Sequence, residues 1–339
     1  MLKVALIGYG GIAGAHAPAW KLLEERGKAK LIAACDIRPE RFAIKQEINI
    51  GAGEALSADV HTYTDYCEML EKEEIDLVDI CLPTPLHAPV AIDVLKKGYH
   101  VQCEKPMARS YEQTLEMLDA AKESGKTLMI GQGLRFALEY VFLKEKIESG
   151  EFGKPVSAVF RRMSGPPLWA WENWYMNHDM SGGCLWDMHI HDVDMIRFLF
   201  GEPKAVSCVT EDLYAGDDIV HSRFYYDDLA VTAIGDWSQE CVPFTADYRI
   251  AFEKATVHCE NGEITVYPRN GESTGEKWSP KLEGDNFFAN ELNFITDVIS
   301  EGRENVTNPP ESAAATIRLC ELLKQSADEK GAIVSCEEL

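Results

Sequence analysis

Residues 1–16 read MLKVALIGYGGIAGAH, and this stretch decides the fold of the first part of the chain. The apolar run Val4–Ile7 is followed by the spacing G-x-G-x-x-A and then at once by an alanine-rich helical pattern. Gly8 permits a tight turn, Gly10 lets the backbone approach a pyrophosphate, and Ala13 lets the helix pack closely on the strand, so that the helix N-terminus faces the phosphates. The motif therefore predicts a dinucleotide-binding turn, lined by Gly8, Gly10, Gly11 and Ile12.

An acidic residue follows the second apolar run of the chain. Leu31–Cys35 ends in Asp36, at the distance where a carboxylate reaches a ribose hydroxyl. The alternative interpretation makes Asp36 a turn residue before Pro39. A carboxylate suits two neutral ribose hydroxyls and repels a 2′-phosphate, so NAD is favoured, while the nearby Arg38 keeps NADP open.

The composition of the chain limits its partners. The 339 residues predict about two domains, and 56 acidic against 33 basic residues give a formal charge of −23, which repels nucleic acid and anionic membranes. No apolar run reaches the roughly 18 residues of a membrane span, and no leader precedes the strand that starts at residue 2. Ten scattered cysteines without C-x-x-C spacing indicate reduced thiols rather than a disulfide framework or a metal site. We therefore expect a cytoplasmic protein without nucleic-acid or membrane partners and without a metal.

Residues 1–130 alternate between strand-like and helical patterns, which predicts a doubly wound parallel sheet of the α/β class. Asp65 and Ser110 are predicted helix N-caps, and Gly98 and Gly125 fall where helices should end. The expected strands cover residues 3–7, 30–35, 77–82, 99–103 and 127–130. The expected helices cover residues 11–25, 39–47, 65–72, 87–97 and 110–124.

Residues 131–339 show a different pattern and predict an α+β domain built on a mostly antiparallel sheet. Asp227-Asp228 and Asn261-Gly262 lie between strand-like arms, and the Asn-Gly pair is a strong hairpin signal. The expected strands cover residues 156–163, 205–212, 219–226, 230–237 and 248–252. The expected helices cover residues 185–200, 287–301 and 310–330.

A lysine follows the predicted fifth strand directly. The sequence there is Cys103-Glu104-Lys105-Pro106. Ligands of a doubly wound sheet gather at the carboxyl ends of the strands, so we expect Lys105 beside the nicotinamide, where an ammonium stabilises a developing oxygen charge. Glu104 supplies a nearby opposite charge. The alternative is an ordinary surface lysine in a turn.

A second polar set lies in residues 182–194, which read GGCLWDMHIHDVD. On a helix Asp187 and His191 are i and i+4 neighbours, and Asp194 continues their stripe. A carboxylate beside an imidazole suits a general base that works near neutral pH. The opposite, core-facing side of this helix carries Leu185, Met188, Ile196 and Leu199.

The pair His189-x-His191 also raises the question of a metal site. Positions two apart on a helix project about 200° apart, so the two rings diverge. Because the apolar spacing favours a helix here, we expect no metal at this pair.

An aromatic segment, Trp169–His178, precedes the double glycine and reads WAWENWYMNH. Aromatic faces stack on the C–H faces of sugars, and amide or imidazole groups bond their hydroxyls. The alternative interpretation is a core or subunit-contact segment. The substrate contacts expected in this segment are Trp174, Asn177 and His178.

With these residues identified, the chain resembles the Gfo/Idh/MocA family, named for glucose–fructose oxidoreductase and inositol dehydrogenase. The resemblance covers nearly the whole chain and implies a Rossmann domain (1–130) and an α+β substrate-binding and oligomerisation domain with an open sheet (131–339). It also implies oxidation or reduction of a sugar or cyclic polyol, by a homodimer or homotetramer. The residues that carry it are Gly8-x-Gly10-x-x-Ala13-x-x-His16, Asp36, Pro83-x-x-x-His87, Glu104-Lys105-Pro106 and Gly182-Gly183…Asp187-x-x-x-His191-x-x-Asp194.

The resemblance assigns roles to individual residues. The catalytic lysine of the family falls on Lys105, and its motif aspartate and histidine fall on Asp187 and His191. The implied cofactor contacts beyond the glycine turn are Asp36, Arg38, Pro83, Thr84, His87, Glu104 and Lys105. The chain departs from the usual family pattern at Thr84-Pro85, Cys184 and His189, which leaves the identity of the substrate open.

The expected activity is that of an NAD-dependent dehydrogenase of sugars or cyclic polyols. His191 takes the hydroxyl proton, Lys105 stabilises the oxygen, and Asp187 orients His191 or holds a neighbouring hydroxyl. A second hypothesis is a redox-neutral enzyme that keeps NAD bound and cleaves or epimerises a sugar through a transient keto form. A third is a nicotinamide-binding regulator without catalysis.

Overall fold

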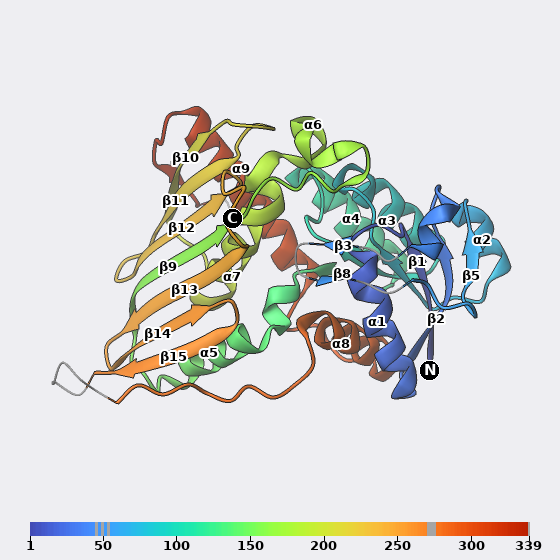
Figure 1. Cartoon of the computed structure of the whole chain (residues 1–339), viewed down its shortest axis with the longest axis horizontal. Helices are drawn as coiled ribbons and strands as arrows, with labels where there is room; N and C mark the ends of the chain where they lie inside the picture. The colour runs from blue at the N-terminus through green and yellow to red at the C-terminus, as the bar shows by residue number, and fades with distance from the viewer. Residues whose placement is uncertain (45–46, 49–50, 53–54, 270–275, 338–339) are drawn as a thin grey trace. The chain divides into compact units, whose positions relative to one another are not determined.

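The computed structural model of the chain divides into two compact units (Figure 1). The first unit comprises Met1–Gly133, Trp169–Trp174 and Asp285–Ala314. The second unit comprises Leu134–Leu168, Tyr175–Gly284 and Ala315–Leu339. The structure describes residues 1–44, 47–48, 51–52, 55–269 and 276–337.

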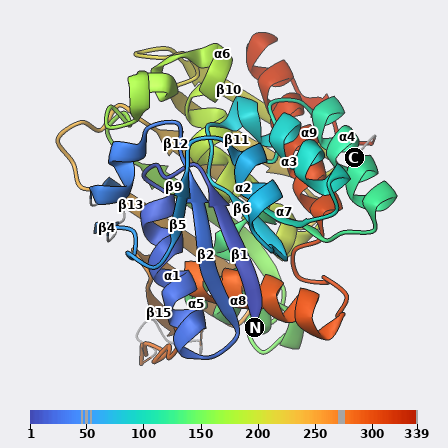
Figure 2. The ribbon, with the colours of Figure 1, turned by 90° about the vertical axis from the view of Figure 1, so that its right-hand side faces the viewer.

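The first unit contains a six-stranded parallel sheet with the order β5-β2-β1-β6-β7-β8. Figure 2 shows β1 and β2 of this sheet side by side. This order, with β1 beside both β2 and β6, is that of a Rossmann fold, in which ligands bind where the strand order reverses. The predicted doubly wound parallel sheet is therefore confirmed. Its strands are β1 (Leu2–Ile7), β2 (Ala29–Cys35), β5 (His61–Tyr63), β6 (Leu77–Ile80), β7 (His100–Glu104) and β8 (Leu128–Gly131). A short separate hairpin pairs β3 (Glu47–Ile48) with β4 (Gly51–Ala52).

Helices of the first unit begin where the sequence predicts. The Asp65 side chain accepts a hydrogen bond from the Cys67 amide at 2.8 Å, and Ser110 accepts one from the Gln113 amide at 3.3 Å. The helix expected at 39–47 is instead the 3-10 turn η1 (Pro39–Ala43), and residues 45–46 lie outside the described part of the chain. The other helices are α1 (Ala13–Glu25), α2 (Tyr66–Lys72), η2 (Thr84–Leu86), α3 (His87–Lys96) and α4 (Tyr111–Ser124).

A helix from far along the sequence completes the core of the first unit. Helix α8 (Phe287–Glu301) packs against α1, and its Leu292 and Ile295 join Trp20 and Leu23 in one buried cluster (Figure 1). An ion pair between Lys28 and Asp297 at 2.8 Å links the end of α1 to the same helix. The first unit is thus built from separate stretches of sequence.

The second unit contains an eight-stranded sheet with the order β15-β14-β13-β9-β12-β11-β10-β16. Only β9 and β12 pair in parallel among its described strands, which confirms the predicted mostly antiparallel sheet. Asn261 (φ 49°) and Gly262 (φ 86°) connect β14 to β15, with the positive φ values that a type I′ hairpin requires. The strands are β9 (Pro155–Met163), β10 (Ala205–Glu211), β11 (Ile219–Tyr225), β12 (Ala230–Asp236), β13 (Thr245–Phe252), β14 (Ala255–Glu260), β15 (Glu263–Pro268) and β16 (Val334–Ser335).

Helices α5, α7 and α9 cover one face of this sheet (Figure 1). The Tyr248 hydroxyl of β13 donates to the Glu139 carbonyl of α5, and the Cys208 amide of β10 donates to the Ser326 hydroxyl of α9. Helix α5 was not predicted, because its apolar residues are spread around the helix rather than along one face. The helical segments wholly within this unit are α5 (Leu138–Ser149), α6 (His178–Ser181), a π-helical turn η5 (Leu185–His189) and α7 (Ile190–Phe200). The segments η3 (Gly133–Phe136), η4 (Trp171–Met176) and α9 (Pro310–Asp328) contain residues of both units.

The described helices include none that combines the length and the apolar character needed to span a bilayer. All ten cysteines are free thiols, and Cys241 is the exposed one among them.

Candidate active site

The glycine turn after β1 is sterically required. Gly8 has a φ of 91°, and a methyl group on it would lie 2.7 Å from the Cys81 carbonyl oxygen at the end of β6. The Gly8 amide donates to the Cys35 carbonyl at 2.8 Å, so the turn is tied to both neighbouring strands. This confirms the physical reason for glycine at the first motif position.

The surroundings of Gly10 are different, because they leave room for a ligand. A methyl group on Gly10 would meet no described atom within 4 Å, so the protein itself gives no steric reason for glycine there. Helix α1 starts at Ala13 with Ile12 as N-cap, with no side-chain cap and no acidic residue in its first turn. An open turn before an uncapped helix N-terminus fits a bound pyrophosphate. The expected contacts Gly10, Gly11 and Ile12 all lie in this turn.

Asp36 is anchored to the glycine turn. One carboxylate oxygen accepts the Tyr9 amide at 2.8 Å, and the other accepts the Arg38 amide at 2.9 Å. An ionised carboxylate has about four lone-pair sites, so these two bonds leave acceptor positions for ribose hydroxyls. The structure therefore brings Asp36 to the edge of the turn, as the sequence predicted.

Arg38 has a partner that the sequence did not suggest. Its guanidinium carbon lies 5.0 Å from the centre of the Trp171 ring, a cation–π distance, and its Nε lies 3.5 Å from Asp36 Oδ1. Trp171 belongs to the part of the aromatic segment that joins the first unit, as does the expected substrate contact Trp174, whereas Tyr175 and the residues after it belong to the second unit. No local signal in the sequence reveals this pairing, because it depends on a long-range contact.

Lys105 emerges at the carboxyl end of β7 from an otherwise buried turn. It is the one partly exposed residue between Val101 and Ala108. The Glu104 carboxylate accepts the Lys105 amide at 3.2 Å, and its other oxygen lies 3.1 Å from His16 Nε2. A methyl group on Gly131 would lie 2.6 Å from that oxygen, so glycine at this position makes room for the carboxylate.

His87 ties two turns together rather than reaching into open space. Its ring is 1% exposed, with Nδ1 2.7 Å from the Pro106 carbonyl and Nε2 2.7 Å from the Leu82 carbonyl. Burial lowers the pKa of His87, which favours a neutral ring. Pro83 and the buried Thr84 form the turn that this ring holds against the Lys105 turn. The contribution of His87 to a cofactor site is therefore indirect.

In the second unit, two polar side chains differ from their neighbours in solvent exposure. Asp187 and His191 are partly exposed, whereas every other residue from Ser181 to Arg197 is buried. The helix that carries them begins with the π-helical turn η5 rather than as the regular α-helix predicted over 185–200. The two residues thus form a small polar surface on an otherwise buried segment.

The predicted polar stripe does not extend to Asp194. Its carboxylate is buried and accepts two hydrogen bonds from Arg135, at 2.8 and 2.6 Å, and one from Thr316 at 2.8 Å. The expectation that Asp194 continues the polar stripe of Asp187 and His191 is wrong, because this residue belongs to an internal ion pair.

His189 and His191 have different environments. His189 is fully buried, with Nε2 2.8 Å from the Ser222 hydroxyl, and burial lowers its pKa to about 3. His189 is therefore a neutral core histidine, while His191 reaches the surface.

The segment before the double glycine is organised by local hydrogen bonds. Asn177 caps α6, its side-chain oxygen accepting the Asp179 amide at 3.1 Å. His178 Nε2 lies 3.0 Å from a carboxylate oxygen of the buried Asp217. A methyl group on Gly183 would lie 2.0 Å from the carbonyl oxygen of residue 216, which explains glycine at this position.

The strand order and the glycine turn are those of an NAD-binding Rossmann domain. A family profile described as "Oxidoreductase family, NAD-binding Rossmann fold" matches residues 2–132, and the profile of the GFO/IDH/MocA C-terminal domain matches residues 140–265. The chain belongs to the Gfo/Idh/MocA family.

Several curated relatives are named as dehydrogenases of sugars or polyols. The chain is 32% identical over 202 residues to myo-inositol 2-dehydrogenase of Thermotoga maritima, covering 59% of this chain and 55% of that protein. It is 32% identical over 210 residues to D-glucoside 3-dehydrogenase of Escherichia coli, covering 61% and 56%. The chain thus spans about half the length of these relatives. It is 27% identical to inositol 2-dehydrogenase of Rhizobium meliloti over 97% of this chain and 98% of that protein.

Solved structures share the fold over the full length. Levoglucosan dehydrogenase in complex with NADH superposes with a TM-score of 0.85 at 19% identity, covering 100% of both chains. The WlbA dehydrogenase of Bordetella pertussis, in complex with NADH and UDP-GlcNAcA, superposes with a TM-score of 0.80 at 20% identity, covering 98% of both chains.

Proposed function

We propose that this protein is an NAD-dependent dehydrogenase that transfers a hydride between nicotinamide and a secondary hydroxyl of a sugar or cyclic polyol. The observation that carries the proposal is the selective exposure of three reactive side chains. Lys105 emerges from a buried turn, and Asp187 and His191 emerge from a buried helical segment. Lys105 also lies at the carboxyl end of β7, the edge at which ligands of a Rossmann sheet bind.

The roles follow from the chemistry of the three side chains. When bound, the oxidised nicotinamide accepts a hydride from the substrate carbon. We propose that His191 takes the hydroxyl proton, that Lys105 stabilises the charge developing on the oxygen, and that Asp187 orients His191 or binds a neighbouring hydroxyl.

We propose that the remaining predicted residues bind cofactor and substrate. Asp36 favours NAD over NADP, because its carboxylate accepts hydroxyls and repels a 2′-phosphate. Arg38, held near Asp36 and Trp171, is the residue through which NADP would be tolerated. The proposed cofactor set also includes Gly8, Gly10, Gly11, Ile12, Pro83, Thr84 and Glu104, while His87 contributes indirectly by holding the turn of Pro83 and Thr84. The proposed substrate contacts beside the three reactive residues are Trp174, Asn177 and His178.

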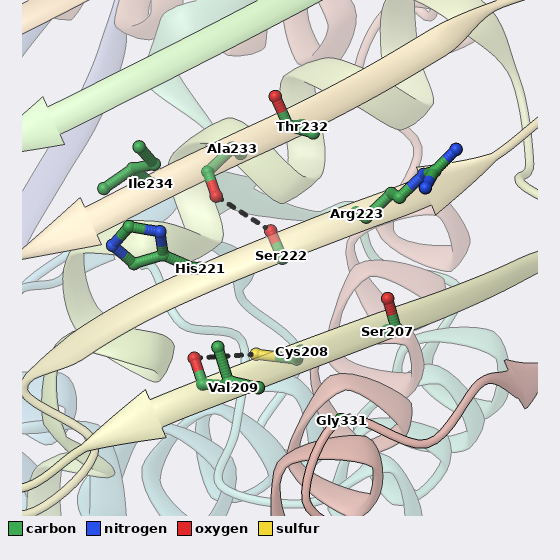
Figure 3. Close-up of a pocket in the computed structure, with 10 residues that line it drawn as sticks. All are labelled: Ser207, Cys208, Val209, His221, Ser222, Arg223, Thr232, Ala233, Ile234 and Gly331. Atoms are coloured by element: carbon green, nitrogen blue, oxygen red, sulfur yellow. Dashed lines mark hydrogen bonds between the residues drawn. The ribbon is translucent and has the colours of Figure 1, made fainter.

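We also propose that the protein forms a homodimer or homotetramer through the face of the second unit's sheet opposite α5, α7 and α9. Exposed Val159 and Val209 on this face support the proposal, as does a pocket of about 360 Å³ over β10, β11 and β12 (Figure 3). Its lining includes Ser207, His221, Arg223, Thr232 and Ile234. The ten free thiols support a reducing, cytoplasmic location.

The test of the proposed activity is NADH formation by the purified protein over inositols, D-glucosides, levoglucosan, aldoses and sugar acids, with NAD and NADP side by side. We expect stoichiometric NADH with one substrate class and a preference for NAD. Product formed without net NADH, with cofactor retained through purification, would instead establish the redox-neutral cycle. Tight NAD binding without turnover of any substrate would contradict both enzyme assignments.

A further inference from the structure

A group of polar side chains lies inside the first unit, near the carboxyl ends of β6 and β7. Asp79 pairs in register with Gln102, and Glu104 lies two residues further on the same face of β7. Helices α1 and α8 supply the groups that face them. Their exposed fractions are between 0% and 6%, so the whole group is sealed from water. We call this group the inner polar cluster: His16, Trp20, Asp79, Gln102, Glu104 and Glu291.

A single imidazole joins two carboxylates of this cluster. His16 Nδ1 lies 2.8 Å from Asp79 and Nε2 lies 3.1 Å from Glu104, while Trp20 donates to Asp79 at 2.8 Å. Burial disfavours the charged ring, but Asp79 and Cys81 outweigh it and raise the pKa of His16 well above its usual value. One imidazolium between two carboxylates leaves one uncompensated negative charge.

Glu291 is the member of the cluster that has no charge to balance it. The two carboxyl oxygens of Glu291 and the two amide atoms of Gln102 make no hydrogen bond of good geometry among the described residues, although the Gln102 amide lies close enough to favour the ionised form of Glu291. A second buried, uncompensated carboxylate costs several kcal/mol, whereas a neutral carboxylic acid costs far less (roughly 1–3 kcal/mol for an unpaired polar group). The lower cost favours a proton on this side chain.

We propose that Glu291 is a neutral, protonated acid in the native protein and that its proton keeps Glu104 in place beneath Lys105. Glu104 is within reach of this effect, because its charge acts on Glu291 inside the same buried cluster. One Glu104 oxygen contacts His16 and the other accepts the Lys105 amide at 3.2 Å. Ionised Glu291 would repel Glu104 and so disturb the turn that presents Lys105. Glu291 is a positioning residue, and its functional consequence rests on the proposed role of Lys105.

The charges on the elements that neighbour Glu291 also favour its protonated form. Burial, Glu104 of β7 and Asp79 of β6 raise the pKa of Glu291 well above its usual value, while His16 of α1 and the amide of Gln102 oppose them.

The first test uses the linkage between protons and stability. Glu291→Gln replaces a neutral acid by a neutral amide of the same size. Unfolded Glu291 releases its proton above about pH 4.3 whereas native Glu291 keeps it, so wild-type loses stability relative to the variant as pH rises. The ratio of the two unfolding equilibrium constants should change about tenfold per pH unit until the native side chain ionises. Urea unfolding of the full chain from pH 5 to 8 measures this ratio.

The matched control is Glu301→Gln, which makes the same change at an exposed position of the same helix. It should show no such pH dependence. A ratio for Glu291→Gln that stays constant with pH would overturn the proposal, as would a Glu291→Gln chain that fails to fold, because an amide replaces only a protonated acid without loss.

The second test observes the proton directly. Wild-type should show the infrared band of a protonated carboxyl group at neutral pH, lost in Glu291→Gln and kept in Glu301→Gln; a band that is equal in all three proteins overturns the proposal. NADH affinity and turnover of wild-type should decline at alkaline pH, with the decline moved to higher pH in Glu291→Gln. The infrared and stability measurements need no turnover, so they separate a failure of this inference from a failure of the proposed dehydrogenase function.

Discussion

The two units present their reactive groups by different physical means. In the first unit, Lys105 follows Glu104, whose carboxylate is held by a buried charged histidine and lies close to a buried acid. In the second unit, Asp187 and His191 rise from a segment whose buried neighbours are apolar or internally paired. The lysine therefore depends on buried electrostatics, and the aspartate–histidine pair depends on packing. Substitutions behind the lysine should change pH behaviour, whereas substitutions behind the pair should change stability.

The substitution Lys105→Met tests the role of the lysine in the first unit and is expected to have the largest effect on turnover. Turnover should fall about a hundredfold or more, because the cation that stabilises the reacting oxygen is lost. Far-ultraviolet circular dichroism should be retained, since the side chain contributes little to the core. Lys122→Met on the exposed side of α4 is the control. Near-normal turnover in Lys105→Met would remove the proposed role of the lysine.

A pair of identical substitutions on one helical segment tests the second unit. Asp187→Asn should lower turnover about tenfold to a hundredfold with little loss of stability, because it removes the charge beside His191. Asp194→Asn should instead lower stability by about 3–5 kcal/mol, because it breaks the buried pair with Arg135. Steady-state kinetics and urea unfolding of both variants decide the matter. Equal loss of turnover and equal stability in the two variants would contradict the division of roles.

A smaller effect, on cofactor affinity, is expected from a substitution at Asp36. Asp36→Ala removes the acceptor of the Tyr9 amide and the group that repels a 2′-phosphate. NAD affinity should fall about tenfold and the preference for NAD over NADP should narrow. Fluorescence titration with NADH and NADPH measures both affinities. An unchanged ratio of the two would show that Asp36 does not select the cofactor.

The smallest effect is expected at Trp171. Trp171→Leu removes a cation–π contact worth about 0.5–1 kcal/mol from Arg38, so NADH binding should weaken about twofold to fivefold. Trp169→Leu, an exposed tryptophan in the same segment, serves as the control. Equal effects of the two substitutions would show that the contact with Arg38 has no part in binding.

Local sequence patterns were sufficient for much of the fold. The glycine turn at Gly8, the caps at Asp65 and Ser110 and the hairpin at Asn261-Gly262 depend on neighbouring residues alone, and the structure confirms each of them. Helix α5 was missed because it lacks an apolar face. Helix α8 was predicted, but its sequence does not show that it packs in the core of the first unit. The failure at α5 is therefore local, whereas the place of α8 depends on contacts between distant segments.

The candidate site also contains residues that local patterns identify and residues whose environment depends on distant segments. Periodicity separated Asp187 and His191 from the core but misplaced Asp194, because Arg135 lies 59 residues away in sequence and its pairing leaves no local trace. The contact between Trp171 and Arg38 also could not be predicted from the local sequence. Glu291 did leave a signal, since it falls at helical spacing with Phe288, Leu292 and Ile295, and a glutamate on an apolar helix face marks a special environment.

The position of α8 in the sequence also determines when the first unit can be completed during synthesis. When residues 1–133 have left the ribosome, all six strands of the parallel sheet exist, but the helix that covers Trp20 and Leu23 has not been made. Roughly 150 more residues must be translated first, which takes about 8–30 s at ordinary rates of 5–20 residues per second. During that interval the growing chain exposes an apolar surface, and a fragment that ends before α8 exposes it permanently.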